Sequence, residues 1–127
     1  MNRLIGQSFE VVEQVNDWEH TGNDAILFWQ DGRIKYALSH EQDCCETVYI
    51  EDICGDLTDL ENTPILMAEE SSNSDFNPNE YESATWTFYK LGSQKGYVDI
   101  RFFGNSNGYY SESAHFMEFD ESGNHIY

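Results

Sequence analysis

The densest group of potential metal ligands lies in one stretch of the chain, where His40 precedes the adjacent pair Cys44 and Cys45, and Cys54 follows nine residues later. Imidazole and thiolate are ligands that Zn²⁺ prefers, and four of them would complete a tetrahedron. Adjacent residues of a strand point to opposite faces, however, so the cysteine pair can share one ion only if the chain turns sharply between them. We therefore expect buried free thiols and no metal or other cofactor, and keep these four residues as the alternative ligand set.

Two further chemistries have less support. Oxygen ligands are available from Asp52, Asp56, Asp59 and Glu61, but their spacing lacks the register of a calcium-binding loop. A thiol nucleophile needs positively charged surroundings, whereas acidic residues flank the adjacent cysteines. The sequence contains no phosphate-binding or dinucleotide-binding glycine motif and no nucleophile-elbow motif. We therefore predict no catalytic residues and expect that the protein is not an enzyme.

Charge is the strongest signal in the composition. The 127 residues include 24 Asp and Glu against six Lys and Arg, which gives a formal net charge of −18. A magnitude of about 2–8 already keeps a small domain soluble. Nucleic acids and anionic membranes are bound through clustered Lys and Arg, so we expect direct binding to neither. A basic protein surface or a cation is the partner that this charge favours, and a merely solvated acidic surface is the simpler interpretation.

The acidic residues are concentrated in the middle of the chain, where residues 41–83 contain thirteen acids and no Lys or Arg. A globule of this length has a radius of gyration of about 14 Å and a diameter of roughly 36 Å. Duplex DNA of that length carries about 21 negative charges, which is comparable to the charge of this chain. The sequence therefore favours a DNA-mimic-like protein that binds a basic nucleic-acid-binding surface. The predicted partner-binding residues are Asp43, Glu46, Tyr49, Glu51, Asp52, Asp56, Asp59, Glu69 and Glu70.

The C-terminal part of the chain supports a different kind of ligand. Several aromatic side chains there accompany an arginine, and together they could stack on and pair with a small nucleotide. The overall negative charge opposes an anionic ligand, so this is the second interpretation. The candidate ligand-binding residues are Tyr89, Tyr97, Arg101, Phe103, Tyr109 and Tyr110.

Elements that position these residues follow from alternation of apolar and polar side chains. The pattern predicts a mainly β fold, with α+β as the alternative: a single antiparallel-sheet domain over residues 1–127 with one short helix. Residues 24–30 and 33–38 form strands separated by Asp31 and Gly32. Because a type I′ turn needs positive φ at both central residues, this Asp-Gly pair predicts a tight hairpin.

Capping and breaking residues mark the other elements. Asp56 can cap a short helix over residues 56–61, and Pro64 prevents its continuation. Residues 69–83 are polar and predict a long surface loop, and residues 122–127 predict a frayed tail. The last three predicted strands, expected to form one antiparallel meander, are residues 84–91, 96–104 and 108–119.

The predicted core follows from the same alternation. Trp86, Phe88 and Lys90 are expected to share one face of their strand, with the two aromatic side chains directed inward. The full set of expected core residues is Phe28, Ile34, Tyr36, Val48, Ile50, Leu57, Leu60, Ile65, Leu66, Trp86, Phe88, Val98, Ile100 and Phe102.

Location is suggested by what the sequence lacks. The first twenty residues contain no apolar run of signal-peptide length, and no run approaches the roughly 18 residues that span a bilayer. Three cysteines are an odd number, and two are adjacent, which favours a reduced cytoplasmic protein. The oligomeric state cannot be read from these features.

Several segments also resemble a family of small bacteriophage and prophage proteins. They are HEQDCCETVYIEDICGDLTDL, PILMAEESSNS, WTFYKL, GYVDIRFFG and SNGYYSES, and the resemblance covers about residues 24–118. The resemblance implies a viral accessory protein in the cytoplasm of a bacterial host, and it carries no catalytic residues with it. Small phage proteins of this kind often oppose host defence. The expected function is thus inhibition of a basic host protein. The alternatives are a sponge for a nucleotide immune signal and a structural or metal-binding phage protein.

Overall fold

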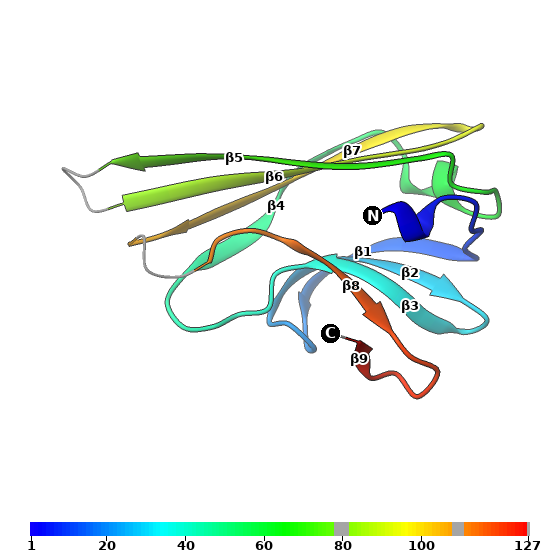
Figure 1. The fold of residues 1–127 in the computed structure, drawn as a ribbon, viewed down its shortest axis with the longest axis horizontal. Coiled ribbons are helices and arrows are strands. Elements are labelled where there is room, and N and C mark those ends of the chain that lie inside the picture. The colour runs from blue at the N-terminus through cyan, green and yellow to red at the C-terminus, as the bar shows by residue number, and fades with distance from the viewer. Residues whose placement is uncertain (78–81, 108–110, 127) are drawn as a thin grey trace.

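Two antiparallel sheets lie face to face in the computed structural model, which describes residues 1–77, 82–107 and 111–126 (Figure 1). The elements are the 3₁₀ helices η1 (Asn2–Leu4) and η2 (Leu57–Leu60), and the strands β1 (Val11–Trp18), β2 (Asn23–Gln30), β3 (Arg33–Ser39), β4 (Thr47–Cys54), β5 (Met67–Asn77), β6 (Glu82–Ser93), β7 (Gly96–Ser106), β8 (His115–Phe119) and β9 (His125–Ile126). The sheets have the strand orders β1-β2-β3-β8-β9 and β4-β7-β6-β5. The predicted mainly β, antiparallel class is confirmed.

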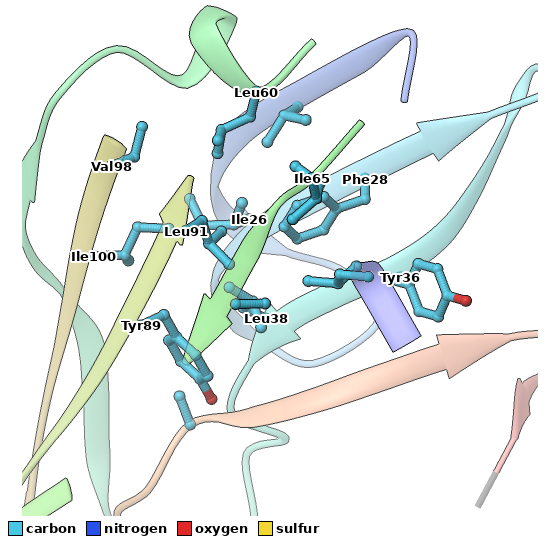
Figure 2. Close-up of a cluster of buried hydrophobic side chains, with 14 of the residues drawn as sticks. Ile26, Phe28, Tyr36, Leu38, Leu60, Ile65, Tyr89, Leu91, Val98 and Ile100 are labelled. Carbon is cyan, nitrogen blue, oxygen red and sulfur yellow. The ribbon is translucent and has the colours of Figure 1, made fainter. Parts of the chain in front are cut away.

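The main core fills the space between the sheets. The five-stranded sheet contributes Phe28 and Leu38, and the four-stranded sheet contributes Tyr89, Leu91 and Ile100, all fully buried (Figure 2). Alternate residues of each strand point into this layer, which is how two facing sheets build a shared core. The face of each sheet that points away from this core is therefore available for other contacts.

The predicted Asp-Gly turn and the predicted helix cap are both confirmed. Asp31 and Gly32 both have positive φ, 56° and 76°, in the β2–β3 hairpin. The Asp56 carboxylate accepts a hydrogen bond from the backbone N–H of Thr58 at 3.0 Å and begins η2. The predicted short helix is thus confirmed as a single 3₁₀ turn.

The prediction for β6 placed the wrong face inward. Tyr89 and Leu91 are buried, whereas Phe88 is 37 % exposed, and Trp86 is half-buried on the outer face with Lys90. Trp86, Phe88 and Lys90 do share a face, and that face is the outer one because the lysine needs solvent. The expected core residue Leu66 is also wrong, since its side chain is 61 % exposed.

The segment predicted as a polar loop is mostly a strand. β5 pairs with β6 along its whole length, from Met67 opposite Gly92 to Asn77 opposite Glu82. An exposed edge strand is held by backbone pairing with its neighbour and does not need alternating apolar side chains. The polar sequence of β5 therefore gave no strand signal. Residues 78–81 of the predicted loop lie outside the described residues.

The predicted C-terminal meander is also only partly correct. β6 and β7 form the expected hairpin, but β8 crosses to the other sheet and pairs with β3, with Ser39 opposite His115. The crossing segment lies so close to β7 that a Cβ on Gly104 would stand 2.2 Å from the carbonyl oxygen of Glu112. The predicted tail is not frayed over β9, which pairs with β8. Among the described residues, no helix is long and apolar enough to span a membrane.

Candidate protein-binding face

The outer face of the β4-β7-β6-β5 sheet carries a continuous group of aromatic side chains. Phe103 on β7 lies opposite Tyr49 on β4 and Trp86 on β6 in the strand register. Its ring centroid is 5.7 Å from that of Tyr49 and 5.3 Å from that of Trp86. Phe88 lies two residues further along β6, and Tyr49 is 41 % exposed. These four side chains form a ridge that solvent reaches.

Carboxylates border this ridge in the neighbouring cross-strand rows. One row contains Asp52, Arg101 and Phe88, and the next places Lys90 between Glu69 and Asp99. Opposite charges in such neighbouring positions attract one another across the strands. A hollow of about 460 Å³ opens over these rows. We call the set the aromatic–acidic face; it consists of Tyr49, Trp86, Phe88, Phe103, Glu51, Asp52, Glu69 and Asp99.

Arg101, a cation of this face, forms an ion pair with Glu51. The Nε atom of Arg101 lies 2.7 Å from Oε1 of Glu51, and both side chains remain partly exposed. Glu51 is the extra residue at an irregularity in the β4–β7 register, between Ile50 and Asp52. The guanidinium is therefore engaged by the protein's own carboxylate, while Asp52, Glu69 and Asp99 remain exposed beside the ridge.

Of the predicted partner-binding residues, four belong to the aromatic–acidic face: Tyr49, Glu51, Asp52 and Glu69. Glu70 lines the same hollow. Three further acids of the set lie elsewhere: Asp56, which is exposed, and Asp59, which is half-buried, are at η2, and the exposed Asp43 is in the loop between β3 and β4. The structure thus divides the predicted set between separate regions of the surface.

Glu46 is a correction to that set, because only 3 % of it is exposed. Its carboxylate accepts hydrogen bonds from Nε2 of His40 at 2.9 Å and from the backbone N–H groups of Cys44 at 2.9 Å and Asp43 at 3.1 Å. A carboxylate so enclosed holds its own loop together and cannot contact a partner protein.

The partner of Glu46 lies between two oxygen acceptors. Nδ1 of His40 lies 2.8 Å from the carbonyl oxygen of Ser113, which can only accept, and Nε2 lies 2.9 Å from the Glu46 carboxylate. The imidazole therefore ties the Glu46 loop to the segment that precedes β8. Although burial raises the pKa of Glu46, the hydrogen bonds from His40 and the backbone outweigh it and lower that pKa from 4.5 to about 2.

This lowered pKa predicts a loss of stability in acid. Above pH 4.5 the Glu46 carboxylate is ionised in both the folded and the unfolded chain, so the hydrogen bonds that it accepts contribute fully. Between pH 4.5 and about 2 the unfolded chain takes up the proton first, and the contribution falls. We expect the difference in unfolding free energy between the wild type and Glu46→Gln to shrink across this window.

Urea unfolding followed by tryptophan fluorescence, at steps from pH 7 to pH 2, measures that difference. Subtracting the variant removes the general effect of protonating the other carboxylates, which relieves repulsion in a chain of net charge −18. A difference that stays constant through the window would contradict the assigned role of Glu46.

The alternative ligand-binding residues do not form one site. Tyr97, Arg101 and Phe103 are on the outer face of β7, but Tyr89 points into the core (Figure 2) and is fully buried. Burial, with a smaller contribution from Glu70, raises the pKa of the Tyr89 hydroxyl. Tyr89 therefore cannot stack on a ligand. The candidates Tyr109 and Tyr110 lie outside the described residues.

The cysteine region differs from the expectation of free thiols. Cys44 and Cys45 are joined by a disulfide, and Cys54 is free and exposed. The pair lies in a turn and not on a strand, so the rule that neighbours point to opposite faces does not apply there. His40 is occupied by Glu46, and Cys54 ends β4 opposite Asp99. Within the described parts of the chain, His, Cys, Asp and Glu side chains form no group that could hold a metal ion.

Sequence reasoning missed the outward position of Trp86 and Phe88. Lys90 was the available signal, because a lysine in the same alternating set prefers the solvent side of a sheet. Asp99, which completes the acidic border, lies two residues from Arg101 and was not singled out because nothing in its local sequence distinguishes it.

Comparison with known proteins identifies a family. The family model described as "Domain of unknown function (DUF7448)" matches residues 2–116. No curated protein and no solved structure matches the chain. The matched region includes the whole aromatic–acidic face and every strand up to the beginning of β8. The chain therefore belongs to the family of the domain of unknown function DUF7448.

Proposed function

We propose that the protein is an acidic inhibitor that uses the aromatic–acidic face to bind a basic, nucleic-acid-binding surface of another protein. The observation that carries the proposal is the exposed ridge of Tyr49, Phe103, Trp86 and Phe88 bordered by carboxylates. Protein interfaces obtain most of their affinity from a few aromatic and arginine side chains at the centre of the contact. A ridge of this kind supplies those anchors.

Electrostatics supports a basic partner. Asp52, Glu69 and Asp99 lie at the rim of the ridge, where they can form charge-assisted hydrogen bonds with Lys and Arg of the partner. The formal net charge of −18 would also steer a basic protein toward the molecule, with an attraction that salt screens beyond about 8 Å. A surface that normally binds DNA presents the complementary charge, and the inhibitor would occupy the place of the DNA.

The nucleotide sponge is less well supported than protein binding. An anionic ligand would have to compete with Glu51 for the guanidinium of Arg101, since these groups already form an ion pair. Tyr89, one of the aromatic side chains needed for stacking, is buried in the core. The same face is therefore better suited to a cationic partner.

The biological setting of this proposal is a bacteriophage accessory protein acting in the cytoplasm of a bacterial host. Its support is the resemblance of the cysteine-pair and SNGYYSES segments to small phage proteins. In that setting the target would be a host protein, and one that belongs to host defence is favoured by the usual role of such small phage proteins.

Neutralising three carboxylates of the face tests the charge contribution. We expect the variant Asp52→Asn, Glu69→Gln, Asp99→Asn to bind its partner about tenfold more weakly, because an exposed ion pair contributes about 0.2–1 kcal/mol. The partner is first captured from bacterial lysate at low salt and identified by mass spectrometry. Its affinity for the wild type and the variant is then measured by calorimetry, with duplex DNA as competitor.

The matched control neutralises three acids away from the face, Glu13→Gln, Glu41→Gln and Glu121→Gln, so that both variants lose the same net charge. Equal weakening by the two variants would show that only overall charge matters and that the face has no role. Retention of no basic protein, or a captured partner that still binds DNA normally, would contradict inhibition by DNA mimicry.

A further inference from the structure

The outer face of the five-stranded sheet has its own small apolar layer. Ala25, Leu27 and Ala37 point away from the main core but are buried. The described strands of the second sheet lie on the other side of the five-stranded sheet (Figure 1). They are covered by large side chains of their own sheet, among them Trp18 and Phe119. This arrangement leaves the indoles of Trp18 and Trp29 partly exposed to solvent.

A groove of about 580 Å³ runs over this layer. Phe119 of β8 lies at one wall, with its ring centroid 5.9 Å from that of Trp18 and 5.1 Å from that of His20. Trp29 of β2 also lines the groove. Its indole Nε1 is buried and has no hydrogen-bond partner among the residues that the structure describes. The volume lies within the range of pockets that bind small molecules, about 300–1,000 Å³.

The groove differs from the rest of the molecule in its charge. Its charged lining side chains are Glu19 and Arg33, one of each sign, in a chain of net charge −18. Nη1 of Arg33 donates to the carbonyl oxygens of Asp120 at 2.9 Å and Phe119 at 3.3 Å, so the guanidinium is held in place. The net negative charge of the protein repels an anionic ligand, and within the groove the opposite charges of Glu19 and Arg33 offset one another, so the lining itself offers no net charge to a cation. The balance favours a ligand without net charge.

We propose that this groove binds a neutral carbohydrate. A pyranose ring has an apolar C–H face that can pack on the partly exposed indole of Trp18, which the buried ring of Phe119 supports from beneath. Its hydroxyl edge can donate to the carboxylate of Glu19 and accept from Arg33. Large aromatic side chains with a few placed polar groups are the composition that small-molecule sites use. The site is independent of the aromatic–acidic face, which lies on the other sheet.

Titration with defined ligands tests the proposal. The probes are three neutral trisaccharides (maltotriose, cellotriose and triacetylchitotriose), choline as a cation and AMP as an anion, followed by tryptophan fluorescence and calorimetry. We expect saturable binding of at least one trisaccharide, with choline and AMP at least tenfold weaker. The variant Trp18→Ala should weaken that binding at least tenfold, and Trp86→Ala, on the other sheet, should leave it unchanged.

A second variant keeps the test valid if Trp18→Ala fails to fold. Glu19 is exposed, so Glu19→Ala should retain the wild-type unfolding transition and weaken trisaccharide binding about threefold or more. Three results would each overturn the proposal: no trisaccharide binds, choline or AMP binds as tightly as the best trisaccharide, or a folded Glu19→Ala variant binds like the wild type.

Discussion

Replacing His40 by alanine should destabilise the folded protein by about 3–5 kcal/mol. Removing one partner of a buried, hydrogen-bonded pair leaves the remaining carboxylate poorly compensated, which costs about that amount. Glu46 would keep its backbone donors but lose His40, and the carbonyl oxygen of Ser113 would lose its contact with the imidazole. A domain has a total stability of only about 5–15 kcal/mol, so the variant should be close to unfolded. Urea unfolding at pH 7, followed by tryptophan fluorescence, measures the loss.

His115 provides the matched control for this substitution. Its ring stacks 6.0 Å from that of His40, but its side chain is exposed. Desolvation, together with the charge of His40, lowers the pKa of His115, so it is not expected to carry a stabilising charge at neutral pH. We expect His115→Ala to cost less than about 1 kcal/mol, as surface substitutions usually do. A His40→Ala protein as stable as His115→Ala would refute the structural role of the buried His40–Glu46 contact.

Replacing Trp86 by alanine should weaken binding to the basic partner about 30-fold or more. Central aromatic side chains of an interface typically contribute 2 kcal/mol or more when removed, and 1.4 kcal/mol corresponds to a factor of ten. Trp86 packs on Phe103, which in turn contacts Tyr49, so its loss opens the middle of the ridge. Calorimetry with the purified partner gives the affinity ratio. The more exposed Tyr49→Ala should also weaken binding, with less effect on folding.

The control for these aromatic substitutions is Phe76→Ala. Phe76 is 53 % exposed on β5, and it lies opposite Ser83, in the alternating set that faces away from the aromatic–acidic face. Its removal deletes a similar exposed ring without changing the ridge, so we expect partner binding to stay within about twofold of the wild type. If Phe76→Ala weakens binding as much as Trp86→Ala, the outer face of the sheet is not the contact surface.

The sequence by itself determined those features that depend on near neighbours. The Asp31-Gly32 turn requires positive φ at two adjacent residues, and the cap of η2 requires one side chain within two residues of its donor. Alternation gave the mainly antiparallel β class, and counting residues gave the net charge of −18. Four of the nine predicted partner-binding residues lie on the aromatic–acidic face; alternation accounts for Tyr49, whereas Asp52 shares this face because the β4–β7 register shifts at Glu51.

Only the tertiary structure decided which side of each strand faces the second sheet. The side chains of a strand alternate, so choosing the opposite side exchanges core and surface; Trp86 and Phe88 were placed inward for this reason. The polar strand β5 is held by its pairing with β6, and β8 pairs with β3 in the other sheet. These pairings join distant residues, and no local pattern encodes them.

Glu46 is a single-residue example of what sequence alone cannot predict. In the sequence it is one of thirteen acids in a segment without basic residues, and nothing distinguishes it from its neighbours. Its carboxylate contacts Nε2 of His40, whose ring is oriented by the carbonyl oxygen of Ser113, 73 residues away from that histidine. A buried carboxylate is stable only where such donors converge. That convergence exists only in the folded chain, so the tertiary structure alone separates this structural carboxylate from the exposed acids available to a partner.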